Sequence, residues 1–181
     1  DLRMSRGLGD VYKRQTLEGL RTRGWNIPEE AIQTGLQAAY IAGRMQVVGT
    51  KPLVLLDGAH NVGGISELCK NVKVFTPKGK IYAVLGMCSD KEVQEVVNGI
   101  DFPVQKYYLT PLQNERSLDP AQLAQYLACH RTQTVTCMDC VDALQQAVSA
   151  AQPEDLVLVF GSLYLVGEVE KLLDDRKLQT F

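Results

Sequence analysis

Short runs of aliphatic residues, each followed by a stretch with helical spacing, recur along most of this chain. The runs predict strands at residues 44–48, 53–56, 81–85, 104–109, 134–138 and 156–160. The helical patterns cover residues 64–72, 91–100, 120–129, 141–150 and 163–173. Because the strand runs lack polar alternation, both faces of the sheet must be buried under helices. The pattern therefore predicts an α/β fold, a three-layer sandwich with a mainly parallel sheet of about six strands.

The first 41 residues follow a different pattern. Apolar residues between Thr16 and Ile41 recur at helical spacing with a break at Arg23-Gly24, which predicts two helices. Residues 1–15, DLRMSRGLGDVYKRQ, show no sustained period and read like translated adaptor or cloning-derived sequence. We therefore exclude residues 1–15 from the predicted fold.

Charge and hydropathy argue against several classes of function. The formal net charge is -2, and the basic residues are scattered without interleaved aromatics, which disfavours nucleic-acid binding. The longest apolar runs are strand-length, far short of the roughly 20 residues that a bilayer requires. No secretory signal is evident, and five cysteines without framework spacing fit reduced thiols. We expect a cytoplasmic protein.

The one CxxC motif is Cys137-Met-Asp-Cys140. A zinc site needs four ligands, usually from two such pairs, and no second pair is present. Small buried residues are the simpler interpretation, and metal or redox chemistry remains the alternative. No metal ligands are predicted in this chain.

Polar residues follow two of the predicted strands. Asp57 and His60 come after residues 53–56, with Asn61 as a helix N-cap, and Ser162 comes after residues 156–160. Loops at the carboxyl ends of parallel strands form the ligand-binding crevice of an α/β sheet, and helix N-termini there favour anions. These residues predict a polar crevice, although a turn-capping Asp57 and a surface His60 would serve structure alone.

Arg44 lies where the helical region gives way to the first strand. It is either a solvated loop arginine or a phosphate ligand with bidentate geometry. No G-x-x-x-x-G-K-[ST] and no G-x-G-x-x-G after the first strand occur, so a self-sufficient NTPase and a dinucleotide dehydrogenase are disfavoured.

A resemblance to a known family rests on four segments, taken in this order and at these separations. They are Gly43-Arg44-Met45-Gln46, LVLLDGAHN, IYAVLGMCSDK and VFGSLYLVGEV. Together they closely resemble the carboxy-terminal domain of bacterial folylpolyglutamate synthase/dihydrofolate synthase, within the Mur ligase superfamily. The resemblance covers about residues 16 to 175 and implies a Rossmann-like fold of the Mur ligase C-terminal domain type. Residues 43–181 would form this domain, and residues 16–42 the last helices of an amino-terminal ATPase domain and a hinge.

The resemblance implies an ATP-dependent ligase that adds L-glutamate to a pteroate or folyl-glutamate through an acyl phosphate. It implies Arg44 and Asp57 as ATP-binding residues, and His60 and Ser162 as glutamate-binding residues, with His60 also catalytic. ATP and Mg²⁺ would be required, and the P-loop and the Mg²⁺ ligands would belong to the amino-terminal domain. We expect a monomer that is inactive without that domain.

Two departures from the family pattern concern proline, which the family usually has before Gly43 and after Asn61. Here Ala42 and Val62 occupy those places, which loosens the hinge and the helix start without removing a ligand. The alternative function is a free-standing Rossmann-like module that binds a nucleotide or an amino acid without catalysis.

Overall fold

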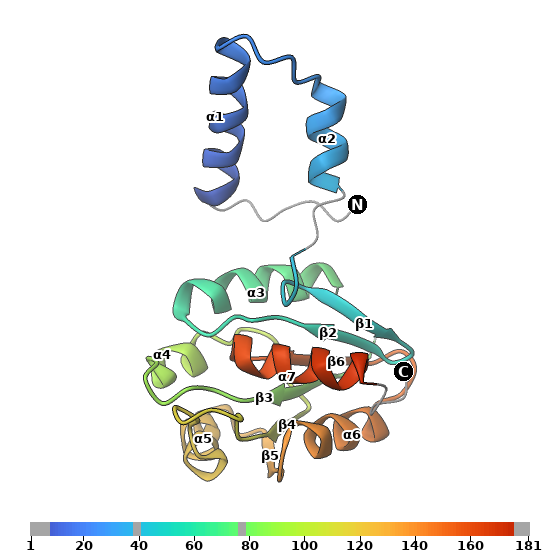
Figure 1. The fold of residues 1–181 in the computed structure, drawn as a ribbon. Helices are drawn as coiled ribbons and strands as arrows, with labels where there is room; N and C mark the ends of the chain where they lie inside the picture. The colour runs from blue at the N-terminus through green and yellow to red at the C-terminus, as the bar shows by residue number, and fades with distance from the viewer. Residues whose placement is uncertain (1–7, 38–40, 76–78, 176–181) are drawn as a thin grey trace. The chain divides into compact units, whose positions relative to one another are not determined.

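The computed structural model describes residues 8–37, 41–75 and 79–175 and divides the chain into two compact units, residues 1–41 and 42–181. The first unit contains helices α1 (Leu8–Thr22) and α2 (Glu29–Gln37), shown in Figure 1. Two helices are present, as the spacing predicted, but α1 begins at Leu8 instead of Thr16. Leu8, Val11 and Tyr12 already follow the i, i+3, i+4 rule, so the helical period starts earlier than predicted. The adaptor origin of residues 1–15 stays a prediction.

One six-stranded sheet forms the centre of the second unit, with strand order β1-β2-β6-β3-β4-β5. Its strands are β1 (Gln46–Thr50), β2 (Leu53–Leu56), β3 (Ile81–Leu85), β4 (Lys106–Leu109), β5 (Gln133–Thr136) and β6 (Leu156–Phe160). Only β1 runs antiparallel to its neighbour β2. The two residues between β1 and β2 are too few for a parallel crossover. The predicted mainly parallel, six-stranded sheet is confirmed.

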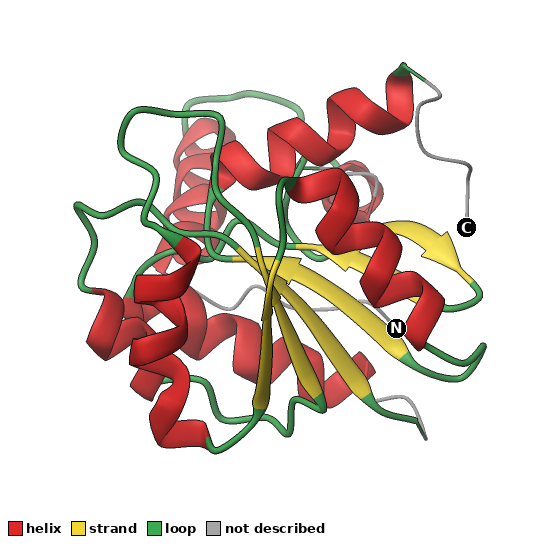
Figure 2. Ribbon diagram, turned by 90° about the horizontal axis from the view of Figure 1, so that it is seen from below, coloured by secondary structure: helices red, strands yellow, loops and turns green. Residues whose placement is uncertain are grey.

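Helices cover both faces of this sheet (Figure 2). They are α3 (Val62–Phe75), α4 (Val93–Asn98), α5 (Pro120–Leu127, followed by the 3-10 turn Ala128–His130), α6 (Cys140–Ala150) and α7 (Leu163–Asp174). Buried residues of α3, α4 and α5 join one hydrophobic cluster, and those of α6 and α7 join another. The three-layer arrangement that the sequence predicts is therefore present.

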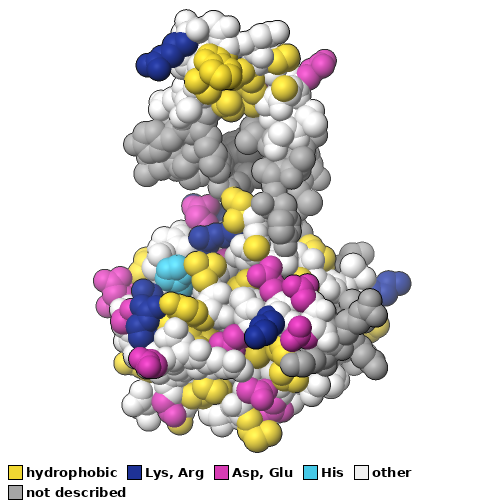
Figure 3. All heavy atoms as spheres, in the orientation of Figure 1, with side chains coloured by type: hydrophobic (Ala, Val, Ile, Leu, Met, Phe, Trp, Pro, Cys, Tyr) yellow, Lys and Arg dark blue, Asp and Glu magenta, His cyan; other side chains and the backbone are white. Residues whose placement is uncertain are grey.

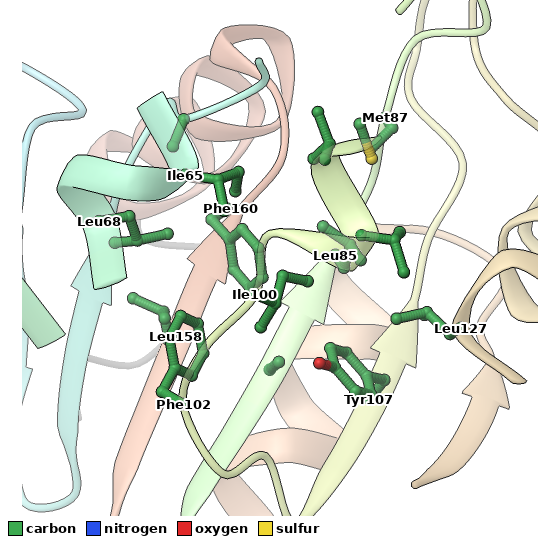
Figure 4. Packing of buried hydrophobic residues seen from close by; sticks show 14 of the residues in the cluster. Ile65, Leu68, Leu85, Met87, Ile100, Phe102, Tyr107, Leu127, Leu158 and Phe160 are labelled. Atoms are coloured by element: carbon green, nitrogen blue, oxygen red, sulfur yellow. The ribbon is translucent and has the colours of Figure 1, made fainter. Parts of the chain in front are cut away.

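The central strand β6 is buried on both faces, which explains why its sequence shows no polar alternation. Leu156, Leu158 and Phe160 pack into the cluster under α3 to α5, while Val157 and Val159 face α6 and α7. All five are fully buried, and each such side chain stabilises the fold by about 1.5–3 kcal/mol. Figure 4 shows the first cluster, in which the rings of Phe102 and Phe160 meet edge to face with centroids 6.1 Å apart.

Within residues 42–181, the predicted element boundaries lie within three residues of those observed. Capping side chains set most helix starts. Asp119 accepts backbone N–H bonds at the start of α5, Asp139 at the start of α6 and Ser162 at the start of α7. Asn61 does the same for α3 through the Gly64 N–H, at 2.8 Å.

Acidic and basic side chains of residues 42–181 are interspersed on the face shown in Figure 3. No helix in the described ranges combines the length and the apolar character that crossing a membrane demands.

Candidate functional site

The candidate site lies at the carboxyl ends of three neighbouring strands. Strand order places β6 between β2 and β3, so the loops that follow these strands meet at one edge of the sheet. These loops begin at Asp57, Gly161 and Gly86. Residues about a hundred positions apart in sequence thus come together, as His60 and Ser162 do in one cleft.

Three backbone hydrogen bonds hold the loop after β2 in place. The Asp57 N–H donates to the Val159 carbonyl at 2.9 Å, and the Gly161 N–H donates to the Ala59 carbonyl at 3.0 Å. The Gly58 N–H donates to the Gly43 carbonyl at 2.7 Å, which joins this loop to the segment that carries Arg44. A Cβ at Gly58 would overlap the Leu163 side chain, which would have to move aside.

The Asp57 side chain is buried and binds two backbone amides. Its Oδ2 accepts from the Met45 N–H at 3.0 Å and its Oδ1 from the Ala59 N–H at 2.8 Å. Burial raises the pKa of Asp57 above its ordinary value, and the two amide bonds and the Arg44 guanidinium oppose that rise less strongly. The geometry makes Asp57 the group that fastens residues 43–45 to the end of β2.

Arg44 stands exposed on the segment that Asp57 fastens. Its neighbour Met45 has a φ of 45°, in the left-handed region, and the N–H of Met45 is the one that Asp57 binds. Among the described residues, no hydrogen bond or ion pair engages the Arg44 side chain. Its guanidinium is therefore available to an anion at this edge of the sheet.

His60 is half-buried, and its ring is oriented by its own loop. Nδ1 lies 2.8 Å from the Gly58 carbonyl oxygen. A carbonyl oxygen only accepts, so Nδ1 carries the proton in the neutral ring and Nε2 is left as an acceptor. His60 can therefore accept a hydrogen bond, or a proton, from a ligand in the cleft that it lines.

Ser162 is the N-cap of α7, and its Oγ accepts from the Tyr164 N–H at 3.1 Å. That bond leaves the hydroxyl proton for a second partner. Gly161 precedes it with a φ of 105°, which an L side chain rarely adopts. The turn that presents Ser162 depends on this glycine.

These residues border a cleft of about 200 Å³. Its lining consists of His60, Cys88, Lys91, Arg116, Gly161, Ser162, Leu163 and Tyr164. Two of them are cationic and none is acidic, and the amino end of α7 adds the positive end of a helix dipole. The cleft is suited to a small anionic ligand.

The structure brings His60 and Ser162 into the cleft and places Asp57 and Arg44 on the adjoining loops, while their functional roles remain predictions. Sequence reasoning assigned no role to Lys91, Arg116 and Tyr164. Lys91 could have been found from the rule about strand ends, because it follows β3. Arg116 could not, since its place in the cleft depends on how the loop between β4 and α5 folds back.

The CxxC cysteines lie elsewhere and are not activated. Burial raises the pKa of Cys137 to about 11 and that of Cys140 to about 12, the opposite of a reactive thiol. All five cysteines are free, and the described residues contain no group of three or more His, Cys, Asp or Glu side chains suited to a metal. The redox interpretation of this motif is not supported.

Comparison with known proteins gives matches over most of the chain. Residues 43–163 match the family model described as "Mur ligase, glutamate ligase domain". The chain is 32% identical over 162 residues to dihydrofolate synthase/folylpolyglutamate synthase of Escherichia coli, a match that covers 89% of this chain and 37% of that protein. The chain therefore spans little more than a third of this relative.

Solved structures of proteins with similar names also match this chain. The E. coli FolC structure in complex with DHPP and ADP superimposes with a TM-score of 0.80 at 31% identity, covering 90% of this chain and 38% of that one. A bifunctional folylpolyglutamate synthase/dihydrofolate synthase with Mn, AMPPNP and L-glutamate bound has a TM-score of 0.75 at 35% identity, covering 87% and 38%. The fold is that of these proteins.

Proposed function

Because this chain belongs to the Mur ligase family through its glutamate ligase domain, we propose that it supplies the amino-acid half of an ATP-dependent ligase site. The reaction would join L-glutamate to a pteroate or folyl-glutamate carboxylate. The observation that carries the proposal is the cationic cleft that His60 and Ser162 share at the amino end of α7. An amino acid with two carboxylates fits this charge.

In this reaction ATP supplies the phosphoryl group that turns a poor electrophile, a carboxylate, into an acyl phosphate. The amine of glutamate then attacks the carbonyl carbon, the C–N bond forms, and phosphate leaves with the C–O electron pair. The amine must first lose a proton from its ammonium form. His60 Nε2 is the acceptor in the cleft that could take it, although positioning of the amine is the larger contribution we assign to His60.

The hydroxyl of Ser162 would donate to a glutamate carboxylate from the amino end of α7. Arg44 would contact the nucleotide phosphates, and Asp57 would act in ATP binding by holding the Arg44 segment through the Met45 amide. Mg²⁺ ligands are expected in an amino-terminal ATPase domain of the same protein. We also propose that the protein is a cytoplasmic monomer.

The test joins residues 42–181 to the amino-terminal part of the E. coli relative and measures glutamate addition to dihydropteroate and to a folate. We expect turnover by the joined protein and neither ATP hydrolysis nor glutamate addition by the 181-residue chain alone. Turnover by the chain alone, or inactivity of the joined protein where the parent enzyme works, would contradict the proposal. If the 181-residue chain binds ATP or glutamate but the joined protein is inactive, the result would favour the alternative function, a binding module without catalysis.

Variants of the joined protein test the residues. Arg44→Ala and His60→Ala should each lower kcat/KM by about a hundredfold or more, because positioning and charge neutralisation dominate this chemistry. Arg131→Gln is the control, since Arg131 follows the 3-10 turn and precedes β5, at the opposite edge of the sheet. Near-normal kinetics in both site variants would remove their assigned roles.

A further inference from the structure

Arg116 connects three elements around the cleft. Its Nη1 donates to Asp90 Oδ2 at 3.0 Å, and its Nη2 donates to the Tyr164 hydroxyl at 2.5 Å. Its guanidinium also lies 5.4 Å from the centroid of the Tyr164 ring. The Arg116 carbonyl accepts from the Ser89 N–H at 2.7 Å, so the loop between β4 and α5 is attached to the loop after β3 as well.

The Asp90 carboxylate is shared unequally between two cations. Arg116 holds Oδ2 at hydrogen-bond distance, whereas Lys91 Nζ lies 3.7 Å from Oδ1, beyond a normal hydrogen bond. Asp90, Lys91 and Arg116 together carry one net positive charge, and Lys91 and Arg116 both line the cleft. Without Arg116, the nearest cation left for Asp90 would be Lys91, and the pair would be neutral.

We propose that Arg116 is a positioning residue that keeps the cleft receptive to an anionic amino acid. It occupies the Asp90 carboxylate, which leaves the Lys91 ammonium only weakly paired, and it fixes the Tyr164 phenol at the cleft wall. The inference rests on the proposed function of the cleft, because it names what sets the charge that glutamate would meet. Arg116 acts here through Asp90, Lys91 and Tyr164.

The binding test titrates the 181-residue chain with L-glutamate as the probe. The affinity is measured from the changes in ¹⁵N-resolved NMR chemical shifts. Removing one unit of charge at about 4 Å in a water-like dielectric should weaken binding about fivefold in Arg116→Gln. Asp90→Asn added to Arg116→Gln should restore affinity to within about twofold, because no carboxylate then competes for Lys91. Arg131→Gln makes the same chemical change far from the cleft and should leave affinity unaltered.

Unchanged affinity in Arg116→Gln, or no recovery in the double variant, would overturn the inference. A merely structural role for Arg116 would not produce the recovery. If Arg116→Gln does not fold, Arg116→Lys takes its place, since an ammonium keeps the charge but cannot hold both Asp90 and Tyr164. The expected loss is then smaller and in the same direction.

A ligand-free measurement separates this inference from the proposed function. A crystal structure of the Arg116→Gln chain should place Lys91 Nζ at about 3 Å from the Asp90 carboxylate, closer than the present 3.7 Å. An unchanged separation would overturn the inference even if the parent binds glutamate. The closer contact in a chain whose parent binds no glutamate would uphold the role of Arg116 in holding Asp90 away from Lys91 and count against the proposed ligand.

Discussion

Replacing Asp57 by asparagine tests whether its buried carboxylate fastens the Arg44 segment. The two backbone donors approach different oxygens, the Met45 N–H at Oδ2 and the Ala59 N–H at Oδ1. An asparagine offers one oxygen and one NH₂ group, so in either orientation one N–H faces another donor. Losing a hydrogen bond to a charged acceptor destabilises the fold by about 1.5–3 kcal/mol. Asparagine has no charge to bury, which offsets part of this loss. We expect a net destabilisation of about 1–2 kcal/mol at neutral pH.

Asp119→Asn is the matched control for this change. One oxygen of Asp119, Oδ1, accepts both the Ala121 and the Gln122 N–H, and an asparagine keeps that oxygen. The free energy of unfolding should therefore change by less than about 0.5 kcal/mol at this N-cap. Urea unfolding followed by circular dichroism gives both values, and amide exchange of Met45 reports the local effect.

The sign of the pH dependence follows from the raised pKa of Asp57. A carboxyl group with a raised folded-state pKa contributes stability below its unfolded pKa, near 3.8, and loses that contribution as the pH rises through the folded value. The asparagine side chain does not titrate, so the penalty of Asp57→Asn should be larger near pH 4 than at pH 7. Unaltered stability together with unaltered Met45 exchange would refute the reasoning.

Two further predictions concern the turn after β6 and the thiols. Gly161→Ala should destabilise the chain by more than about 2 kcal/mol, because φ is 105° and a Cβ would lie 2.6 Å from Leu85 Cδ1 and 2.7 Å from the Gly86 carbonyl oxygen. Gly167→Ala, in the interior of α7 with open space around it, should instead stabilise by about 0.5–1 kcal/mol; thermal melts of both variants compare them. A thiol reagent at pH 8 should label Cys129 rapidly in the folded chain and the buried, high-pKa Cys137 and Cys140 slowly, as mass spectrometry would resolve.

Periodicity was enough to predict the centre of the sheet and its helices because the central strands are buried by helices on both faces. The runs at residues 53–56, 81–85 and 156–160 coincide with β2, β3 and β6, since no solvent-facing position interrupts them. Edge strands were placed less well. β5 ends at Thr136, two residues before the predicted end, because Met138 already donates to Asp142 at the start of α6.

The sequence predicted a polar crevice at the strand ends but not all of its walls. Asp57, His60 and Ser162 follow strands, so the rule for parallel sheets placed them at the carboxyl edge. The order of strands is not written in any local pattern, and only the insertion of β6 between β2 and β3 makes the loop after β3 a wall of the same cleft. Lys91 lies in that loop, and Arg116 joins it only because the loop between β4 and α5 folds back.

Asp57 illustrates a limit of a different kind. An acid after a buried strand has the same appearance in sequence whether it binds a ligand or backbone amides, and only backbone geometry separates the two. Here the left-handed backbone conformation of Met45 turns its N–H toward Asp57 Oδ2, so the carboxylate is hydrogen-bonded within the protein. The neighbouring Arg44 side chain is exposed. The proposed function at this edge would then depend on a structural acid and an exposed guanidinium acting together. Asp57→Asn should therefore weaken nucleotide binding in the joined enzyme less than Arg44→Ala does, and an effect larger than that of Arg44→Ala would mean that Asp57 contacts the nucleotide itself.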